Sequence, residues 1–221
     1  RWGEDGTSDR VQFSNDIKNK NYEDSLVALG DLLMTAHAKD AKKFEGQIGE
    51  LEKIIVPEFV EVIGPDGKII GTYHKMHIPS LLPDLYAENY YFEKGDQGFK
   101  VFDTPYGKIA PMICYDQWFP EGARIAASKG AQILIYPTAI GWPLSNPEWK
   151  KQAEHEAWQT IQKSHSIANN VFVAAVNRIG TEDDLKFWGT SFVSDPYGRV
   201  IKKASTNKEE NSVAEIDLGL I

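Results

Sequence analysis

The 221-residue chain contains a single cysteine, Cys114, and this scarcity already restricts the class of protein. One thiol cannot close an intrachain disulfide, and the same count excludes zinc sites that are built from several thiolates. We therefore expect a protein of a reducing compartment, the cytoplasm. A folded chain of this length buries roughly 70% of its unfolded surface, so a hydrophobic core can hold the fold without a metal or a disulfide.

Long apolar runs and an excess of basic residues are also missing. The longest apolar segments are too short for a helix that spans a membrane, so the sequence predicts no membrane partner. The formal net charge is −8, with 24 Lys and Arg against 32 Asp and Glu, which argues against a nucleic-acid partner. A composition of 42% hydrophobic and 25% charged residues is that of a globular enzyme and excludes a disordered chain.

The chain divides into two parts that differ in composition and in hydrophobic pattern. Residues 1–53 are polar and rich in turn-forming residues, apart from 25–41, where apolar residues recur at spacings of three and four and predict an amphipathic helix. Residues 54–221 alternate apolar strand-like runs with helical patterns, of which the longest covers 148–169. We expect an atypical amino-terminal segment followed by one α/β domain with a partly antiparallel sheet, whose last strand is 213–216.

Cys114 ends an apolar run and precedes a helix that we expect to begin at Pro120. A residue at such a strand-to-helix junction is presented at the edge of the sheet, where α/β folds place their sites. The backbone N–H of Tyr115 and the positive end of the helix would favour a thiolate and could hold an oxyanion. The alternative, which composition alone favours, is a buried and inert cysteine.

Several longer motifs occur in order between residues 54 and 218. They include Lys75-Met76-His77-Ile78-Pro79, Glu88-Asn89-Tyr90-Tyr91-Phe92, Ile113-Cys114-Tyr115-Asp116-Gln117-Trp118-Phe119-Pro120-Glu121 and Tyr136-Pro137-Thr138-Ala139-Ile140-Gly141. Through these motifs the chain resembles the nitrilase, or carbon–nitrogen hydrolase, superfamily, and among its branches it looks most like the N-carbamoylputrescine amidohydrolases. The resemblance implies an αββα sandwich of mixed sheets, with the amino-terminal part reduced or rebuilt.

The resemblance also implies a Glu–Lys–Cys mechanism that hydrolyses a non-peptide C–N bond in a carbamoylated amine. Cys114 matches the nucleophile, and Lys75 matches the lysine that stabilises the oxyanion beside the Tyr115 N–H. Glu88 matches the second glutamate, which orients the lysine. Glu58, after a short apolar run, looks like the general base that takes the thiol proton and later activates water.

The sequence departs from the family pattern around Glu58. Only four residues separate Phe59 from Gly64, which opens a Gly-Pro-Asp-Gly turn, whereas the family has a long αβ segment between these points. Either the amino-terminal half is deleted or rebuilt, or Glu58 only imitates the motif. Two alternatives to the leading hypothesis therefore stay open. One is a catalytically impaired or non-catalytic module of the same fold, and the other is an ω-amidase branch of the superfamily.

Two tryptophans are further candidates near the site. Trp118 closely follows Cys114, and Trp142 lies just past an expected strand end, so both are candidates for walls of the acyl pocket.

Three acids are candidates as well. Asp116, Glu121 and Glu154 contribute to an acid-rich neighbourhood that would suit a cationic amine substrate. The alternative for Glu121 is that it caps its helix and pairs with Arg124.

No metal and no cofactor are expected. His74 and His77 lie three residues apart on an expected strand and loop, where this spacing does not put two side chains on one face. The resemblance implies that His165 is a packed, hydrogen-bonded residue and not a base. It also implies a small-molecule substrate, a carbamoylated amine or amide, and a homo-oligomer.

Overall fold

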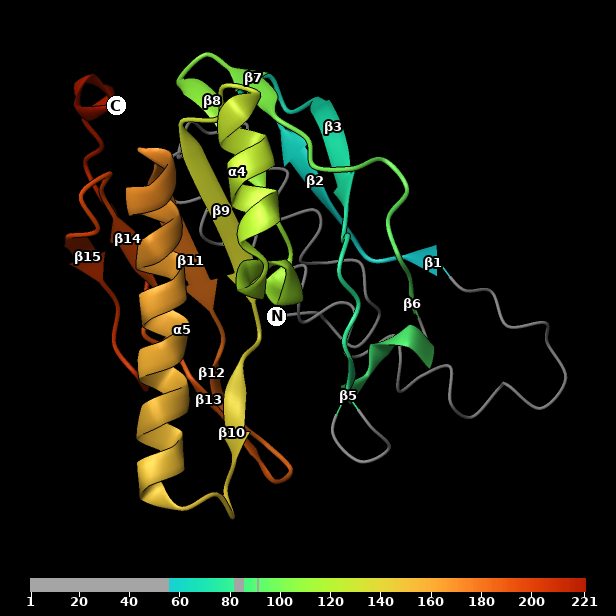
Figure 1. Ribbon diagram of the computed structural model, residues 1–221, viewed down its shortest axis with the longest axis vertical. Coiled ribbons are helices and arrows are strands. Elements are labelled where there is room, and N and C mark those ends of the chain that lie inside the picture. Colours follow the sequence, from blue (N-terminus) through green and yellow to red (C-terminus); the bar gives the residue numbers. More distant parts are fainter. Residues whose placement is uncertain (1–55, 82–85, 91) are drawn as a thin grey trace, which may run out of the picture.

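The computed structural model describes residues 56–81, 86–90 and 92–221, and the predicted segment 1–53 lies outside these residues. The centre is a six-stranded mixed sheet with the strand order β15-β14-β11-β9-β8-β7 (Figure 1). Its strands are β7 (Phe102–Thr104), β8 (Gly107–Pro111), β9 (Ile133–Thr138), β11 (Phe172–Asn177), β14 (Phe192–Ser194) and β15 (Val200–Lys203).

The three central strands of the sheet are parallel, and the outer ones are antiparallel. β9 pairs in parallel with both β8 and β11, and parallel neighbours require crossover connections. These crossovers are the helices α4 (Pro120–Ser128) and α5 (Glu148–Asn169), which lie side by side on one face of the sheet (Figure 1). The predicted helix over 148–169 is confirmed.

Local signals explain where both helices begin, pack and end. α4 has Pro120 in its first turn, where the missing N–H costs nothing, and it buries Ala123 and Ala126. These small side chains let the helix approach the sheet closely. α5 buries Trp158 completely and ends at Asn170, whose φ of 54° gives the left-handed cap that often terminates a helix.

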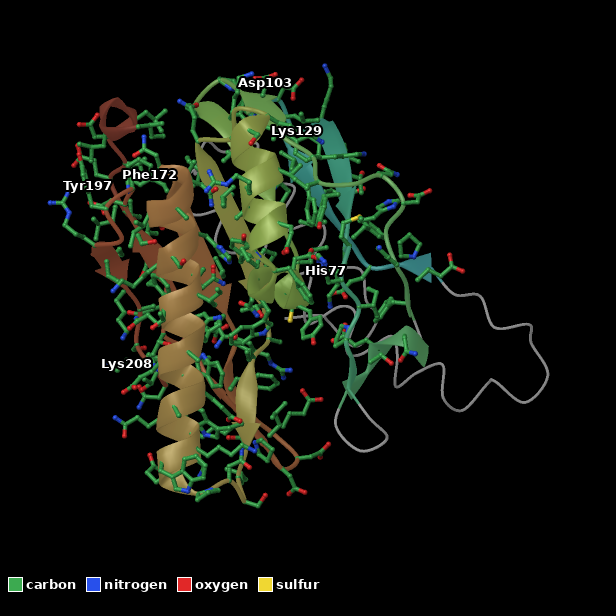
Figure 2. All side chains as sticks on the ribbon, in the orientation of Figure 1. His77, Asp103, Lys129, Phe172, Tyr197 and Lys208 are labelled. Atoms are coloured by element: carbon green, nitrogen blue, oxygen red, sulfur yellow. The ribbon has the colours of Figure 1, made fainter. Side chains whose placement is uncertain are left out.

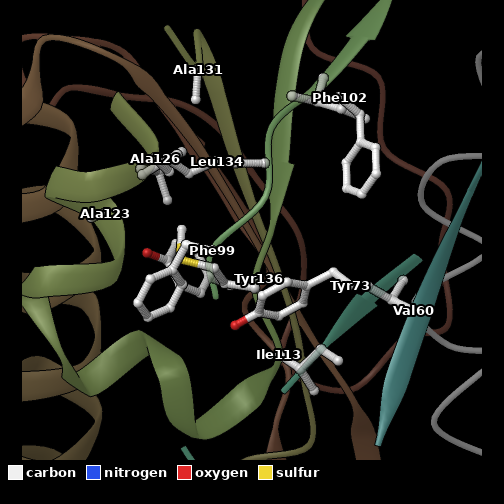
Figure 3. Packing of buried hydrophobic residues seen from close by; sticks show 14 of the residues in the cluster. Val60, Tyr73, Phe99, Phe102, Ile113, Ala123, Ala126, Ala131, Leu134 and Tyr136 are labelled. Carbon is white, nitrogen blue, oxygen red and sulfur yellow. The ribbon is translucent and has the colours of Figure 1, made fainter. Parts of the chain in front are cut away.

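A hairpin of β2 (Phe59–Ile63) and β3 (Ile69–His74) packs beside the β7 edge of this sheet (Figure 1). Its turn contains Gly67, whose φ of 75° favours glycine. Side chains of β2 alternate between buried and half-buried, as expected for a strand with one face on the core. Figure 3 shows Val60 and Tyr73 of the hairpin near Phe102 and Tyr136 of the main sheet, in one hydrophobic cluster.

Short elements connect the hairpin to the sheet. β1 (Val56–Pro57) pairs in parallel with β6 (Phe92–Glu93), and β4 (Ser80–Leu81) pairs with β5 (Tyr86–Ala87). The 3₁₀ helix η1 (Glu88–Tyr90) lies between β5 and β6. Through the pairing of β1 with β6, the residues just before β2 lie beside residues that follow β3.

A small antiparallel sheet of order β10-β13-β12 lies beyond the carboxyl ends of the parallel strands. It consists of β10 (Gly141–Pro143), β12 (Ile179–Glu182) and β13 (Leu185–Trp188). The predicted strand over 213–216 is wrong, because in the described chain no strand follows β15. Its apolar alternation resembles a strand, but Val213 remains 57% exposed, and no described strand pairs with the outer edge of β15.

The described residues confirm the α/β class and the mixed sheet predicted from the sequence. They supply one helical layer, the sheet beneath it and the β2–β3 hairpin (Figure 1). None of their helices combines the length and the apolar character that a membrane crossing requires.

Candidate active site

Cys114 lies at a strained junction between the sheet and the helical layer. It is the first residue of the 3₁₀ helix η2 (Cys114–Trp118), and its φ of 42° falls in the left-handed region that non-glycine residues rarely adopt. Met112 still donates its N–H to the Ile135 carbonyl at 2.8 Å, so the chain stays paired with β9 almost up to the turn. The half-buried thiol therefore sits at the carboxyl ends of the parallel strands, as the sequence predicts.

Lys75 is the centre of a buried charged cluster. Its side chain is 1% exposed, and Nζ donates to Oε2 of Glu58 at 2.7 Å and to Oε2 of Glu88 at 2.5 Å. The hairpin register aligns Phe59 with His74, so Glu58 and Lys75 are the next residues along, and the Lys75 N–H donates to the Glu58 carbonyl at 2.8 Å. Glu88 arrives separately from η1. Two carboxylates thus compensate a buried ammonium that would otherwise be very costly.

The charges of the cluster shift the pKa values of its members. Burial alone would lower the pKa of Lys75, but Cys114, when its sulfur is ionised, and the carboxylates of Glu58 and Glu88 outweigh burial and raise it well above its ordinary value. Lys75 therefore remains a cation across the neutral range. Burial raises the pKa of Glu88, while Lys75 opposes this effect and the nearby Glu58 adds to it.

The pKa of the Cys114 thiol is raised, mainly by burial. Lys75 and a hydrogen bond with Thr138 lower it, whereas the charges of Glu88 and Glu58 raise it further. The expectation that the surroundings favour a thiolate is therefore wrong in its net direction, because burial outweighs the cation. The resting group is a thiol, and any reaction at the sulfur needs a base to remove the proton.

The structure brings together the four side chains that the family resemblance singled out. Glu58 and Glu88 both bond Lys75, and all three act electrostatically on the Cys114 sulfur. The short stretch between Phe59 and Gly64 does not keep Glu58 away from the cluster. β2 starts at the next residue, and the Glu58 side chain is only 10% exposed. The chemical roles of the four residues stay predictions.

Asp116, which the sequence assigns to an acid-rich neighbourhood, does not lie on the surface. It is fully buried, and its carboxylate accepts hydrogen bonds from the Tyr73 hydroxyl, from His77 and from the Ile113 N–H. An open negative surface for a cationic amine therefore cannot include it. No local pattern predicts these contacts, because Tyr73 and Asp116 lie 43 residues apart. Figure 2 shows His77 close to the junction that leads into α4.

Thr138 is a second residue that sequence reasoning missed. It ends β9, is 2% exposed and hydrogen-bonds the Cys114 sulfur, while Nε2 of Gln117 donates to its hydroxyl at 3.2 Å. Its place at the end of the next parallel strand was the available signal. His165 is packed as predicted, since its buried ring donates from Nε2 to the Gln117 carbonyl at 2.8 Å.

The two candidate pocket tryptophans belong to one aromatic cluster. Trp118 of η2 and Trp142 of β10 both pack against a buried cluster that contains Trp158 and Trp188. Trp142 also lines a cavity of about 620 Å³, together with Trp188 and His155. Tyr115 follows Cys114 in η2. Backbone N–H groups in the first turn of a helix have no hydrogen-bond partner within that helix, so they are free to bind another acceptor.

Known proteins resemble both the sequence and the structure. A family model described as carbon-nitrogen hydrolase matches residues 60–221. The N-carbamoylputrescine amidase of Arabidopsis thaliana is 41% identical over 170 residues, which are 73% of this chain and 55% of that protein. The citrullinase of Francisella tularensis subsp. tularensis is 43% identical over 162 residues, 72% of this chain and 55% of that protein. The chain thus spans about half the length of these curated relatives.

A solved structure shows the same relationship in three dimensions. The carbon-nitrogen hydrolase of Helicobacter pylori is 44% identical and superposes with a TM-score of 0.70, covering 74% of this chain and 57% of that one. This match confirms the predicted nitrilase-like fold. The matching relatives confirm the predicted resemblance to the N-carbamoylputrescine amidases.

Proposed function

The chain belongs to the carbon–nitrogen hydrolase family, and on that premise we propose that it hydrolyses a non-peptide C–N bond through an acyl intermediate on Cys114. The observation that carries the proposal is the buried Lys75 ammonium, held between Glu58 and Glu88 and within electrostatic reach of the only thiol. A nucleophile, a base and a fixed cation in one buried place are the groups that acyl transfer requires.

The first step is proton transfer and attack. Because the thiol pKa is raised, Cys114 needs a base, and Glu58 takes the thiol proton in this proposal. The sulfur electron pair then forms a bond to the carbonyl carbon, and the carbonyl π pair moves onto oxygen. Lys75 and the Tyr115 N–H stabilise the resulting oxyanion. Glu88 keeps the Lys75 ammonium oriented.

The second step expels the nitrogen leaving group. The tetrahedral intermediate collapses, the C–N bond breaks, and protonated Glu58 returns its proton to the departing ammonia or amine. Water then enters, Glu58 takes a proton from it, and hydroxide attacks the acyl carbon. The C–S bond breaks, and the Cys114 thiolate recovers its proton. The carbamic acid released in this way decomposes to ammonia or amine and carbon dioxide.

The substrate that we propose is a carbamoylated amine of the N-carbamoylputrescine type. The Arabidopsis thaliana relative at 41% identity is named for that substrate, and the Francisella tularensis relative for citrulline, which also carries a ureido group. Trp118 and Trp142 are proposed as apolar walls near the acyl site. A homo-oligomer in the cytoplasm, with no resident metal or cofactor, belongs to the same proposal.

Ammonia release from N-carbamoylputrescine tests the proposal. The wild-type chain should release ammonia, Cys114→Ala should release none above background, and the quenched wild type should carry the mass of the acyl group on Cys114. The matched control is Ser128→Ala, which removes a hydroxyl from the exposed end of α4. A wild type that neither turns over nor forms the adduct would exclude the proposed reaction for this chain.

Two other functions remain as competing outcomes. The short stretch between Phe59 and Gly64, where the family pattern has a long αβ segment, favours an impaired module, which would form the acyl adduct without releasing product. An ω-amidase activity would instead appear as hydrolysis of monoamides of dicarboxylic acids in preference to carbamoylated amines. A panel with both substrate classes separates the three.

A further inference from the structure

The buried carboxylate of Asp116 uses all of its hydrogen-bonding capacity. Oδ1 accepts from the His77 N–H at 2.9 Å and from Nδ1 of the same residue at 2.8 Å. Oδ2 accepts from the Tyr73 hydroxyl at 2.7 Å and from the Ile113 N–H at 3.0 Å. A carboxylate offers about four lone-pair sites, so these four bonds saturate it. A fully buried acid with this set of partners ties distant segments together.

The partners of Asp116 flank the two reacting side chains. Tyr73 and His77 lie two residues before and two residues after Lys75, and Ile113 immediately precedes Cys114. One carboxylate therefore joins the segment that carries the ammonium to the segment that carries the thiol. The two segments are 39 to 43 residues apart along the chain, so nothing local holds them at a fixed separation.

On the thiol side, Asp116 closes the turn that presents Cys114. The Asp116 N–H donates to the Ile113 carbonyl at 3.0 Å, while the Ile113 N–H donates back to the Asp116 side chain. These reciprocal bonds span Cys114 and hold it at its φ of 42°. Strained backbone persists only where its surroundings overdetermine it, and this pair of bonds does so.

On the lysine side, Tyr73 and His77 are fixed donors. Burial and the charge of Asp116 raise the pKa of Tyr73 above its ordinary value, so its hydroxyl keeps the proton and donates throughout the neutral range. The His77 ring stacks on Phe119 with centroids 3.7 Å apart, just before α4. Because a carboxylate only accepts, Nδ1 of His77 carries the hydrogen.

From this geometry we propose that Asp116 is a positioning residue, which sets the distance between the Lys75 ammonium and the Cys114 sulfur. In the described part of the chain it hydrogen-bonds neither the sulfur nor Nζ of Lys75, so it acts through the two backbone segments. A benefit to catalysis from this positioning depends on the proposed function. The effect of Asp116 on the Cys114 thiol can, however, be measured in an enzyme that does not turn over.

The decisive variant is Tyr73→Phe, matched with Tyr136→Phe. Both rings are fully buried in the same cluster (Figure 3), but the Tyr136 hydroxyl has no hydrogen-bond partner among the described residues. Tyr73→Phe removes one hydrogen bond to Asp116, whereas Tyr136→Phe removes a hydroxyl that makes no hydrogen bond with the described residues. The measurement is the rate of Cys114 alkylation by iodoacetamide from pH 6 to pH 10.5, which reports the thiol pKa.

The sign of the pKa change separates positioning from general structural support. Lys75 lowers the thiol pKa, so a loosened connection should raise it and slow alkylation at pH 8 about threefold to tenfold in Tyr73→Phe. Tyr136→Phe should stay within about twofold of wild type. If Tyr73 only supports the fold, opening the site removes the burial that raises the thiol pKa. The pKa then falls, alkylation accelerates, and the proposal is overturned.

A second variant strengthens the test and separates it from the proposed function. Asp116→Asn should raise the thiol pKa further than Tyr73→Phe, because an amide cannot accept at both ends. Where N-carbamoylputrescine is hydrolysed, Tyr73→Phe should lower kcat with little change in KM. If no ureide is hydrolysed but the alkylation shifts appear, the proposed function fails and the positioning role stands. Identical profiles for Tyr73→Phe and Tyr136→Phe would refute the positioning role.

Discussion

Two regions of the molecule meet at Cys114, and they fix their side chains by different means. The sheet with α4 and α5 relies on apolar packing, with Trp158 and Leu134 fully buried. The described residues between Glu58 and Glu93 form short strands and one 3₁₀ helix, and they hold a buried cation between two carboxylates. Packing tolerates small changes, whereas a buried ion cluster depends on each member because a charge left alone is expensive.

Glu58→Gln should have the largest effect on turnover. It removes the proposed base and keeps the side-chain volume, so hydrolysis of N-carbamoylputrescine should fall about 10²- to 10⁴-fold. Glu61→Gln, in β2 just after Glu58 but outside the cluster, should leave the rate unchanged. Equal rates for Glu58→Gln and wild type would remove Glu58 from the mechanism.

Lys75→Met should show how strongly the ion cluster depends on its cation. It leaves the buried Glu58 and the half-buried Glu88 without a counter-charge, and the free energy of unfolding should fall by about 3–5 kcal/mol. Urea unfolding followed by fluorescence measures this loss. Adding Glu58→Gln to Lys75→Met should recover part of the loss, because one uncompensated charge disappears. A double variant as unstable as the single one would contradict the electrostatic account.

Alkaline pH should lower the free energy of unfolding through two groups of the ion cluster and its neighbour. Cys114 and Lys75 have raised pKa values, so the folded protein keeps these protons where the unfolded chain has released them. Their stabilising contribution is complete below the unfolded pKa values, and the free energy of unfolding should fall as pH rises above about 8.5. In Cys114→Ser the decline should begin only near the ordinary lysine value of about 10.4. Urea unfolding at pH 7 to 10.5 checks both statements, and a stability that rises with pH would contradict them.

An ion pair on the helical layer should matter least. Lys150 and Glu154 lie one turn apart on α5 with 3.7 Å between Nζ and Oε1, and both side chains are more than a third exposed. Glu154→Gln should change the free energy of unfolding by less than about 0.5 kcal/mol, because water screens the pair. Thermal unfolding in low and high salt measures it. A loss comparable to that of Lys75→Met would abolish the contrast between the two regions.

The parts predicted correctly from the sequence are those with local causes. The helix over 148–169 follows from its apolar spacing, and the hairpin follows from the turn that contains Gly67. The residues of the candidate site were found through motifs shared with a family, and periodicity alone would have left Cys114 as an inert core residue. The strand over 213–216 failed because alternation supplies a face but no pairing partner.

By itself the amino-acid sequence determined the helices, the hairpin turn and the kinds of chemical groups available, because these depend on residues close together in the chain. The tertiary structure alone decided that Asp116 is buried against Tyr73, that Lys75 lies between Glu58 and Glu88, and that the thiol pKa rises instead of falling. Interactions between charges depend on distance and on exclusion of water, and both are set by segments that meet only in the folded molecule.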